Sequence, residues 1–198
     1  MGRHKTISDE EVLRVARKAF RTGGFAVSGR EIARLAGVSE AVLYQRFESK
    51  DALFFAAMAP TEPDLAELLG PRGSEGDAHA WVRGAVERMT TYFEDLIPLA
   101  IQVLVHPDRK KGSSREGGPA LTKLEKEFSN RLRSLQQRGE IAPGRPQAIA
   151  RLLTALAHDW ALHNAFLSHR PRLDRASLAA CVEIVWRGLA PGRPAAKR

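Results

Sequence analysis

The stretch SGREIARLAGVSEAVLYQRFESK, residues 28–50, decides how the rest of the chain is interpreted. Ser28 and Glu31 have the spacing of a capping box at the start of a helix. Gly37 stands where that helix must stop, because glycine adopts a positive φ without strain. Ser39 then caps a second short helix. Two short helices joined by a glycine-containing turn indicate a helix-turn-helix, whose second helix enters the DNA major groove; the alternative is an ordinary corner between helices.

The segments REIARLAGVS and LYQRFESKDAL closely resemble the DNA-binding segment of the TetR family of bacterial regulators. The resemblance runs from about Ser8 to Met58, and the remaining two-thirds of the chain do not share it in sequence. It implies a helix-turn-helix DNA-binding domain at residues 1–58, with double-stranded operator DNA as its partner. It further implies a helical ligand-binding and dimerisation domain at residues 59–198.

The resemblance and side-chain chemistry assign two roles to residues of the N-terminal domain. Contacts to phosphates, which fix register and carry little sequence information, are expected from Ser28, Arg30, Tyr44 and Lys50. Ser39, which caps the second helix, also counts among the expected DNA-binding residues. That helix is expected to bring Glu40, Ala41, Val42, Gln45 and Arg46 near base edges. Val42 departs from the family, since many members have a smaller or hydroxylated residue there. The alternative is that the charged side chains only solvate a helix surface.

Composition narrows the class of protein. The 198 residues carry a net charge of +8, which favours an anionic partner. Residues 1–50 contain ten Lys or Arg against six Asp or Glu, whereas residues 51–100 contain three against nine. The single cysteine, Cys181, and the absence of a signal region or an 18-residue apolar run predict a cytoplasmic protein without a membrane span. The sequence has no GxSxG, GxxxxGK or HExxH motif, so we expect no enzyme, catalytic residue, cofactor or metal.

Periodicity predicts an all-α fold of about nine helices, because apolar residues recur at helical spacing and no useful alternating run appears. Beyond the N-terminal domain, prolines and aspartates mark the expected starts. We predict helices over 78–95 after Asp77, a short one from Pro98, one from Pro119 to Gly139, one from Pro146 to about Ser168 and a last one after Asp174.

The last two predicted helices are apolar over more than one face. In the first of them the apolar residues cover far more than a 100° stripe; they include Ile149, Leu152, Leu153, Leu156, Ala157, Trp160 and Leu167. One face can serve the core of the subunit, and the other needs a partner. The resemblance implies a homodimer whose last two helices form a four-helix bundle with their mates. The alternative is a fully buried central helix.

Aromatic residues of the C-terminal domain are candidates for lining a ligand cavity. The candidates are Trp81, Met89, Phe93, Phe128, His158 and Trp160. The alternative for each is an ordinary place in the core. His158, Asp159 and His163 are too few for a good metal site. We therefore expect the two histidines to be hydrogen-bonded within the protein and not to bind a metal.

These observations predict a DNA-binding transcriptional regulator. We expect the protein to be a repressor. It would be released from a palindromic operator when a small apolar or amphipathic ligand binds the C-terminal domain. One alternative is a DNA-binding module controlled by a protein partner, or by no ligand. A second is an all-α enzyme with a vestigial DNA-binding domain.

Overall fold

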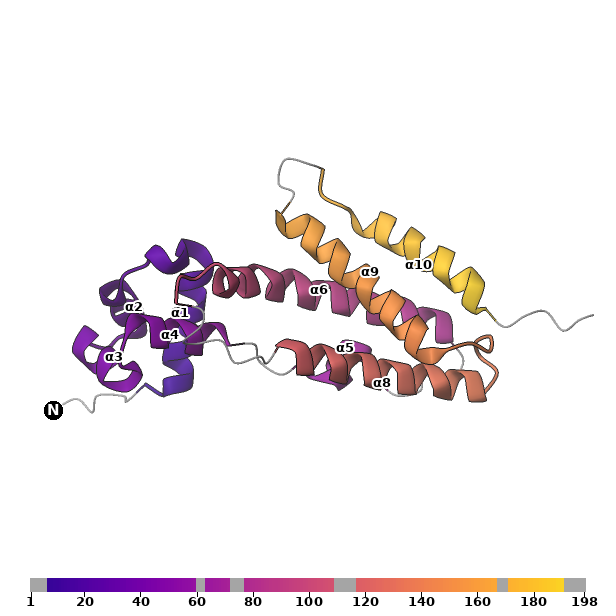
Figure 1. The fold of residues 1–198 in the computed structure, drawn as a ribbon, viewed down its shortest axis with the longest axis horizontal. Coiled ribbons are helices and arrows are strands. Elements are labelled where there is room, and N and C mark those ends of the chain that lie inside the picture. Colours follow the sequence, from indigo (N-terminus) through magenta and orange to yellow (C-terminus); the bar gives the residue numbers. More distant parts are fainter. Residues whose placement is uncertain (1–6, 60–62, 72–76, 109–116, 167–170, 191–198) are drawn as a thin grey trace, which may run out of the picture. The chain divides into compact units, whose positions relative to one another are not determined.

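The computed structural model describes residues 7–59, 63–71, 77–108, 117–166 and 171–190, and gives no side-chain description for 117–120. Within these ranges it contains nine α-helices, one short 3-10 turn and no strand, which confirms the predicted all-α class (Figure 1). The chain divides into two compact units. We call Met1–Thr61 with Pro98–Glu116 the head, and Glu62–Ile97 with Gly117–Arg198 the body. The predicted division after residue 58 lies near the first of these breaks, and the sequence pattern does not reveal that 98–116 groups with the head.

The head contains four α-helices that each begin after a serine. They are α1 Asp9–Gly23, α2 Gly29–Ala36, α3 Glu40–Phe47 and α4 Lys50–Met58, with the 3-10 turn Gly24–Ala26 between the first two. The hydroxyls of Ser8, Ser28, Ser39 and Ser49 accept the amide N–H three residues on, at 3.1–3.2 Å. Each serine thereby satisfies one of the amides that a helix start leaves without a partner.

One apolar core holds the head together. It is formed by Val12, Ala16, Phe20, Ile32, Ala33, Ala36, Leu43, Leu53, Phe54, Ala57 and Met58, all at most 7% exposed. The rings of Phe20 and Phe54 meet edge to face at 5.0 Å, and Phe25 lies 5.3 Å from Phe54. Removing either buried phenylalanine ring would cost about 3–5 kcal/mol, so these contacts fix the scaffold that presents α2 and α3.

Helix α6, Ala78–Leu104, corrects the prediction of two separate helices at this place, because it continues through Pro98. Proline removes one backbone hydrogen bond and usually ends or kinks a helix. Here apolar residues pack on both sides of it: Ile97 is 6% exposed in the body, and Leu99 and Val103 are partly buried against the core of the head. Tertiary packing therefore outweighs the local preference. The division between the two units falls at Pro98.

The body consists of α5 Leu65–Leu69, the first part of α6, α8 Gly117–Gln137, α9 Pro146–Phe166 and α10 Arg175–Leu189. Helix α8 begins two residues before the predicted Pro119. Apolar side chains of α6, α8, α9 and α10 are fully buried, among them Val86, Phe128, Leu153 and Val182. None of the helices in the described ranges is long and apolar enough to cross a membrane.

Polar contacts join the helices of the body at their edges. Arg175 donates to a carboxylate oxygen of Glu94 at 2.7 Å, which ties the start of α10 to α6. His79 Nε2 lies 2.5 Å from Glu183 Oε1, and this contact ties the middle of α10 to the start of α6. Arg88 donates to the Leu68 carbonyl at 3.0 Å, and this bond holds α5 against α6.

Candidate nucleic-acid interface

The turn between α2 and α3 has the geometry that the sequence predicts. Gly37 adopts φ 70° and ψ 27°, the left-handed conformation. Its amide donates to the Arg34 carbonyl at 3.2 Å, and the Val38 amide donates to the Ala33 carbonyl at 3.0 Å. These bonds satisfy the last carbonyls of α2 and redirect the chain into α3. The helix-turn-helix interpretation is therefore confirmed in the backbone.

Helix α3 buries one face and exposes the other. Leu43 is fully buried in the core of the head, while Ala41 and Gln45 are exposed and Val42 is partly buried. The first turn carries Glu40, whose carboxylate lies 3.8 Å from Arg30 of α2. An exposed face with small, amide and charged side chains is suited to the edges of bases in a major groove.

Tyr44 lies against the start of α2, where only a glycine leaves room for it. A Cβ on Gly29 would stand 1.9 Å from the Tyr44 hydroxyl oxygen and 3.1 Å from a Glu40 carboxylate oxygen. Burial, with a smaller contribution from the Glu40 charge, raises the pKa of Tyr44 above its ordinary value of 10.0. The phenol therefore stays protonated at neutral pH and can donate a hydrogen bond to an acceptor such as a phosphate oxygen.

Lys50 stands in the first turn of α4 with its ammonium 4.2 Å from the centre of the Phe25 ring. A cation over an aromatic face is attracted by the ring quadrupole. A cation near a helix N-terminus, however, opposes the helix dipole. The ring therefore holds a positive charge beside amides that attract anions, which is an arrangement that favours a phosphate.

Arg46, expected near base edges, has two partners inside the head. Its guanidinium donates to the Ile7 carbonyl at 2.8 Å and to Asp9 Oδ1 at 3.1 Å. Only 24% of the side chain is exposed. The partners lie 39 and 37 residues earlier in the chain, so no local spacing pattern could have revealed them.

His106 is a buried residue of the head that sequence reasoning missed. Its ring lies 4.3 Å from Phe25 and 4.8 Å from both Phe54 and Phe55. Its Nδ1 accepts the Asp108 amide at 3.1 Å, and its Nε2 lies 3.4 Å from Asp51 Oδ1. The ring fixes the segment after α6 to the aromatic core beneath α4. A histidine followed by Pro107 within a basic stretch gave no sign of this role.

Five of the six predicted ligand-lining residues of the body lie in two groups, in which Trp81 and His158 are partly buried and the others are buried. Phe93 meets His158 edge to face at 5.3 Å. Nearby, Thr154 Oγ1 lies 3.9 Å from the Met89 sulfur. Trp81 and Phe128 form a separate pair at 5.6 Å. The remaining candidate, Trp160, is 7% exposed, and its indole N–H is buried without a hydrogen-bond partner in the described structure.

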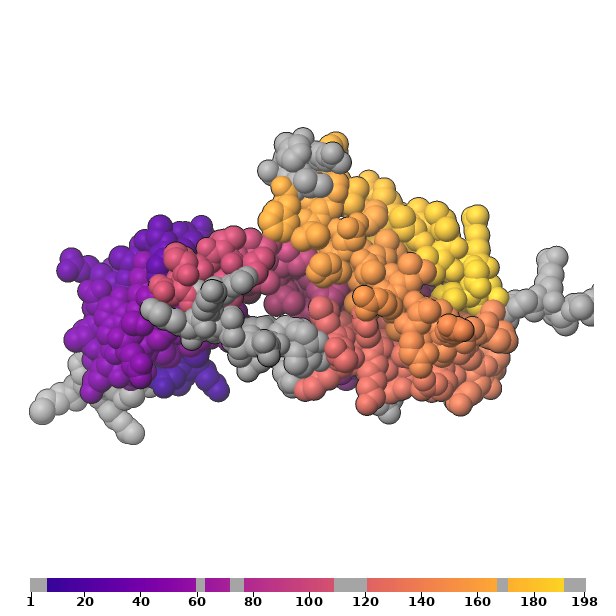
Figure 2. Space-filling view, in the orientation of Figure 1, coloured from indigo at the N-terminus to yellow at the C-terminus, as the bar shows by residue number. Residues whose placement is uncertain are grey.

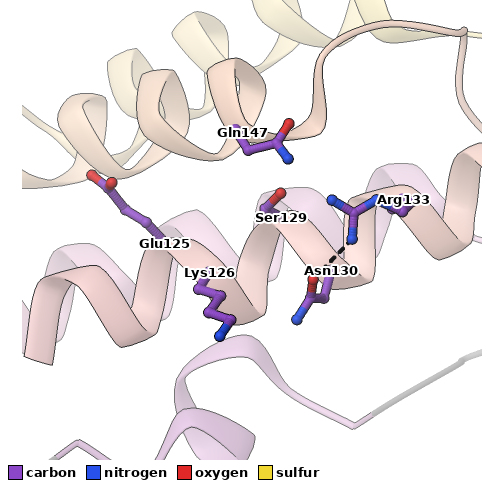
Figure 3. A pocket seen from close by; sticks show the side chains of 6 residues that line it. All are labelled: Glu125, Lys126, Ser129, Asn130, Arg133 and Gln147. Carbon is purple, nitrogen blue, oxygen red and sulfur yellow. Dashed lines mark hydrogen bonds between the residues drawn. The ribbon is translucent and has the colours of Figure 1, made fainter.

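A pocket in the body lies between α8 and the start of α9 and has a volume of about 280 Å³. It is lined by Glu125, Lys126, Ser129, Asn130, Arg133 and Gln147, all drawn in Figure 3. None of the six predicted ligand-lining residues borders it. In Figure 3 Lys126 points away from α9, whereas Ser129 points toward it.

Comparison with known proteins agrees with this geometry. The family model of the bacterial regulatory proteins of the tetR family matches residues 12–57. None of the curated proteins is similar enough in sequence to match the chain.

Solved structures of similar fold cover nearly the whole chain. A TetR-family regulator from Pectobacterium atrosepticum is 24% identical, with 93% of this chain and 95% of that one covered and a TM-score of 0.62. The TetR-family regulator PfmR from Thermus thermophilus is 21% identical, with 94% and 100% covered and a TM-score of 0.59. A transcriptional regulator from Saccharomonospora viridis in complex with choline is 16% identical, with 93% and 97% covered and a TM-score of 0.70.

The fold and the capped helix-turn-helix define the class of the protein: it has a transcriptional-regulator fold with an N-terminal DNA-binding domain. The resemblance found in the sequence is confirmed, because the chain matches the TetR family over residues 12–57 and has the fold of TetR-family regulators along its length. Regulators of this family bind operator DNA, are typically dimers and are generally not enzymes.

Proposed function

We propose that the protein is a homodimeric transcriptional repressor that binds an inverted-repeat operator and is released from it by a small molecule. The observation that carries the DNA-binding part is the surface of α3: Ala41 and Gln45 are exposed on a helix whose opposite face is anchored by Leu43. Around it, Ser28, Arg30, Tyr44 and Lys50 offer hydrogen-bond donors to the phosphates on either side.

Four exposed apolar side chains on α9 and α10 support a dimer. Leu152, Leu162, Phe166 and Ile184 are 37–68% exposed, and Figure 2 shows both helices at the surface of the body. Apolar groups gathered on adjacent helices are stabilised when a second copy covers them. A two-fold dimer carries two copies of α3, so its preferred DNA is an inverted repeat with half-sites one helical turn apart.

The experiment for this part selects bound sequences from a random DNA pool and measures the stoichiometry of the complex. We expect an inverted repeat occupied by two chains, or by a multiple of two. A single half-site without symmetry, occupied by one chain, would contradict the proposal.

Release by an apolar or amphipathic ligand is supported by the aromatic interior of the body. The contact between Phe93 and His158 offers ring faces, and the indole N–H of Trp160, which has no hydrogen-bond partner among the described residues, offers a donor. The similar protein from Saccharomonospora viridis was solved with choline, a cation that aromatic rings bind well. A ligand that favours the released state by about 3 kcal/mol would lower DNA affinity roughly a hundredfold.

Thermal shift against apolar, amphipathic and quaternary-ammonium compounds, choline included, separates this proposal from its alternative. We expect at least one compound to raise the melting temperature and to lower affinity for the selected DNA. If no compound does both, control by a protein partner, or no control by a ligand, is the better account, and the DNA-binding proposal still stands.

A further inference from the structure

The contacts of Arg46 give it a different role from the base reader that its place on α3 predicts. We propose that Arg46 is a positioning residue, which sets the orientation of α3 by tying its last turn to the start of α1. The proposal rests on the DNA-binding function proposed above. It concerns how α3 is held, and it does not require Arg46 to touch DNA.

The two bonds of Arg46 have a defined geometry. The Arg46 guanidinium donates to a carbonyl of the chain just before α1, that of Ile7, and to the carboxylate of Asp9 in the first turn of α1. The planar guanidinium has donors fixed in a fork, so two bonds made by one nitrogen to two acceptors define a direction as well as a distance. Figure 1 shows the beginning of α1 beside α3.

Other contacts also hold α3 in the head. It has eight residues, and Leu43 is its only fully buried side chain within the described structure. Gly37 and Ser39 fix its beginning, whereas its end at Glu48 has a positive φ of 62° in a residue that is not glycine. Phe47, in the last turn of α3, is partly buried against the core of the head. The bonds of Arg46 add a polar attachment in that same turn, with a fixed direction that an apolar contact lacks.

Recognition of bases by α3 depends on the angle at which the helix enters the groove. Side chains must reach hydrogen-bond distance of base edges, and those distances change when the helix tilts. Phosphate contacts from long side chains such as that of Lys50 tolerate small tilts better. Loss of the Arg46 attachment should therefore weaken specific binding more than non-specific binding.

Removal of Asp9 provides the sharpest test, because two simple expectations have opposite signs. Asp9 and Glu10 are both exposed acids in the first turn of α1, and only Asp9 contacts Arg46 in the structure. If charge alone mattered, removing either acid from a DNA-binding domain would strengthen binding. If Asp9 positions α3 through Arg46, Asp9→Ala should weaken operator binding while the matched control Glu10→Ala does not.

The experiment uses full-length protein with Arg46→Ala, Arg46→Lys, Asp9→Ala, Glu10→Ala and the double variant Asp9→Ala/Arg46→Ala. The probes are the inverted repeat selected by the wild-type protein and a duplex of random sequence. We expect Arg46→Ala to weaken operator binding about tenfold, Asp9→Ala somewhat less, and the double variant no more than Arg46→Ala alone. Arg46→Lys should recover part of the loss. The salt dependence should keep its slope, since no phosphate contact is removed.

A second measurement does not need DNA. Amide hydrogen exchange in the free protein should become faster over Glu40–Phe47 in Arg46→Ala and in Asp9→Ala, and stay unchanged in Glu10→Ala. The proposal is overturned if Asp9→Ala behaves like Glu10→Ala in both measurements, or if Arg46→Ala relaxes preference at a single base pair, which is the signature of a base contact. A wild-type protein that selects no sequence would instead contradict the proposed function, while the exchange measurement would still decide the role of Arg46.

Discussion

At the scale of single residues, Gly29 and Tyr44 form a matched pair in which one residue makes room for the other. In Gly29→Ala the new methyl would occupy the position of the Tyr44 hydroxyl, 1.9 Å away, so the ring must move. The helix itself should tolerate alanine well, because alanine has a higher helix propensity than glycine. We therefore expect the melting temperature of Gly29→Ala to change little and its DNA affinity to fall severalfold.

Tyr44→Phe supplies the control for this prediction. It removes the hydroxyl that the new methyl would meet and, on our proposal, a phosphate contact. The affinity of Gly29→Ala/Tyr44→Phe for DNA should then equal that of Tyr44→Phe, which a double-mutant cycle measures directly. Additive losses would show that Gly29 acts on DNA binding by some route other than Tyr44.

Substitutions of Lys50 and Gln45 should distinguish contacts to phosphates from contacts to bases. Lys50→Ala should weaken binding to operator and random DNA by similar factors and make the salt dependence shallower by about one unit of slope per site. It also removes the contact with Phe25, so a loss of about 0.5–1 kcal/mol in stability is expected. The measurement is a titration of both DNAs across a salt series, well below the melting temperature.

Gln45→Ala should show the opposite pattern. It removes an exposed amide, so stability should stay within about 0.5 kcal/mol of the wild type. Operator affinity should fall by roughly 1–3 kcal/mol, with relaxed preference at one position per half-site and an unchanged salt slope. Equal weakening on every sequence would show that Gln45 does not face the base edges.

At the scale of elements, local signals in the sequence predicted the helix starts and the turn, and tertiary contacts decided the rest. Ser8, Ser28 and Ser39 could be identified because capping depends on residues three positions apart. Pro98 misled the prediction because proline signals a local break, whereas packing of Ile97 and Leu99 on either side keeps α6 continuous. The attachment of Arg46 and the burial of His106 join distant segments, which no periodicity can reveal.

Helix α10 gives a pH-dependent prediction through its cap. Hydrogen bonds from Ser177 lower the pKa of Asp174 below its ordinary value of 3.8. Because the pKa is lower in the folded protein than in the unfolded one, the stabilisation is complete above the unfolded value. It is lost as the pH falls through the folded value. Asp174→Ser keeps a cap that does not titrate. The wild type should be the more stable at neutral pH, and the difference should shrink as the pH falls below 3.8, as chemical denaturation at several pH values would measure.

At the scale of the whole molecule, the exposed apolar residues of α9 and α10 link assembly to DNA affinity. Leu152 and Ile184 are 55% and 68% exposed, so a charge at either position costs the isolated chain little. Buried between two copies, the same charge would lack a partner and strongly disfavour association. We therefore expect Leu152→Glu and Ile184→Glu to be folded monomers.

Loss of the dimer should lower DNA affinity, because a dimer binds its DNA through two linked heads. Two heads on one dimer bind an inverted repeat with a high effective concentration for the second contact, which adds about a hundredfold or more to affinity. Monomeric variants should lose that gain on the full repeat and bind an isolated half-site as the wild type does. Val105→Glu is the matched control, because Val105 is 72% exposed and lies outside α9 and α10. Analytical ultracentrifugation together with titration of full and half operators decides the matter: a dimeric Leu152→Glu with unchanged operator affinity would place the dimer interface elsewhere.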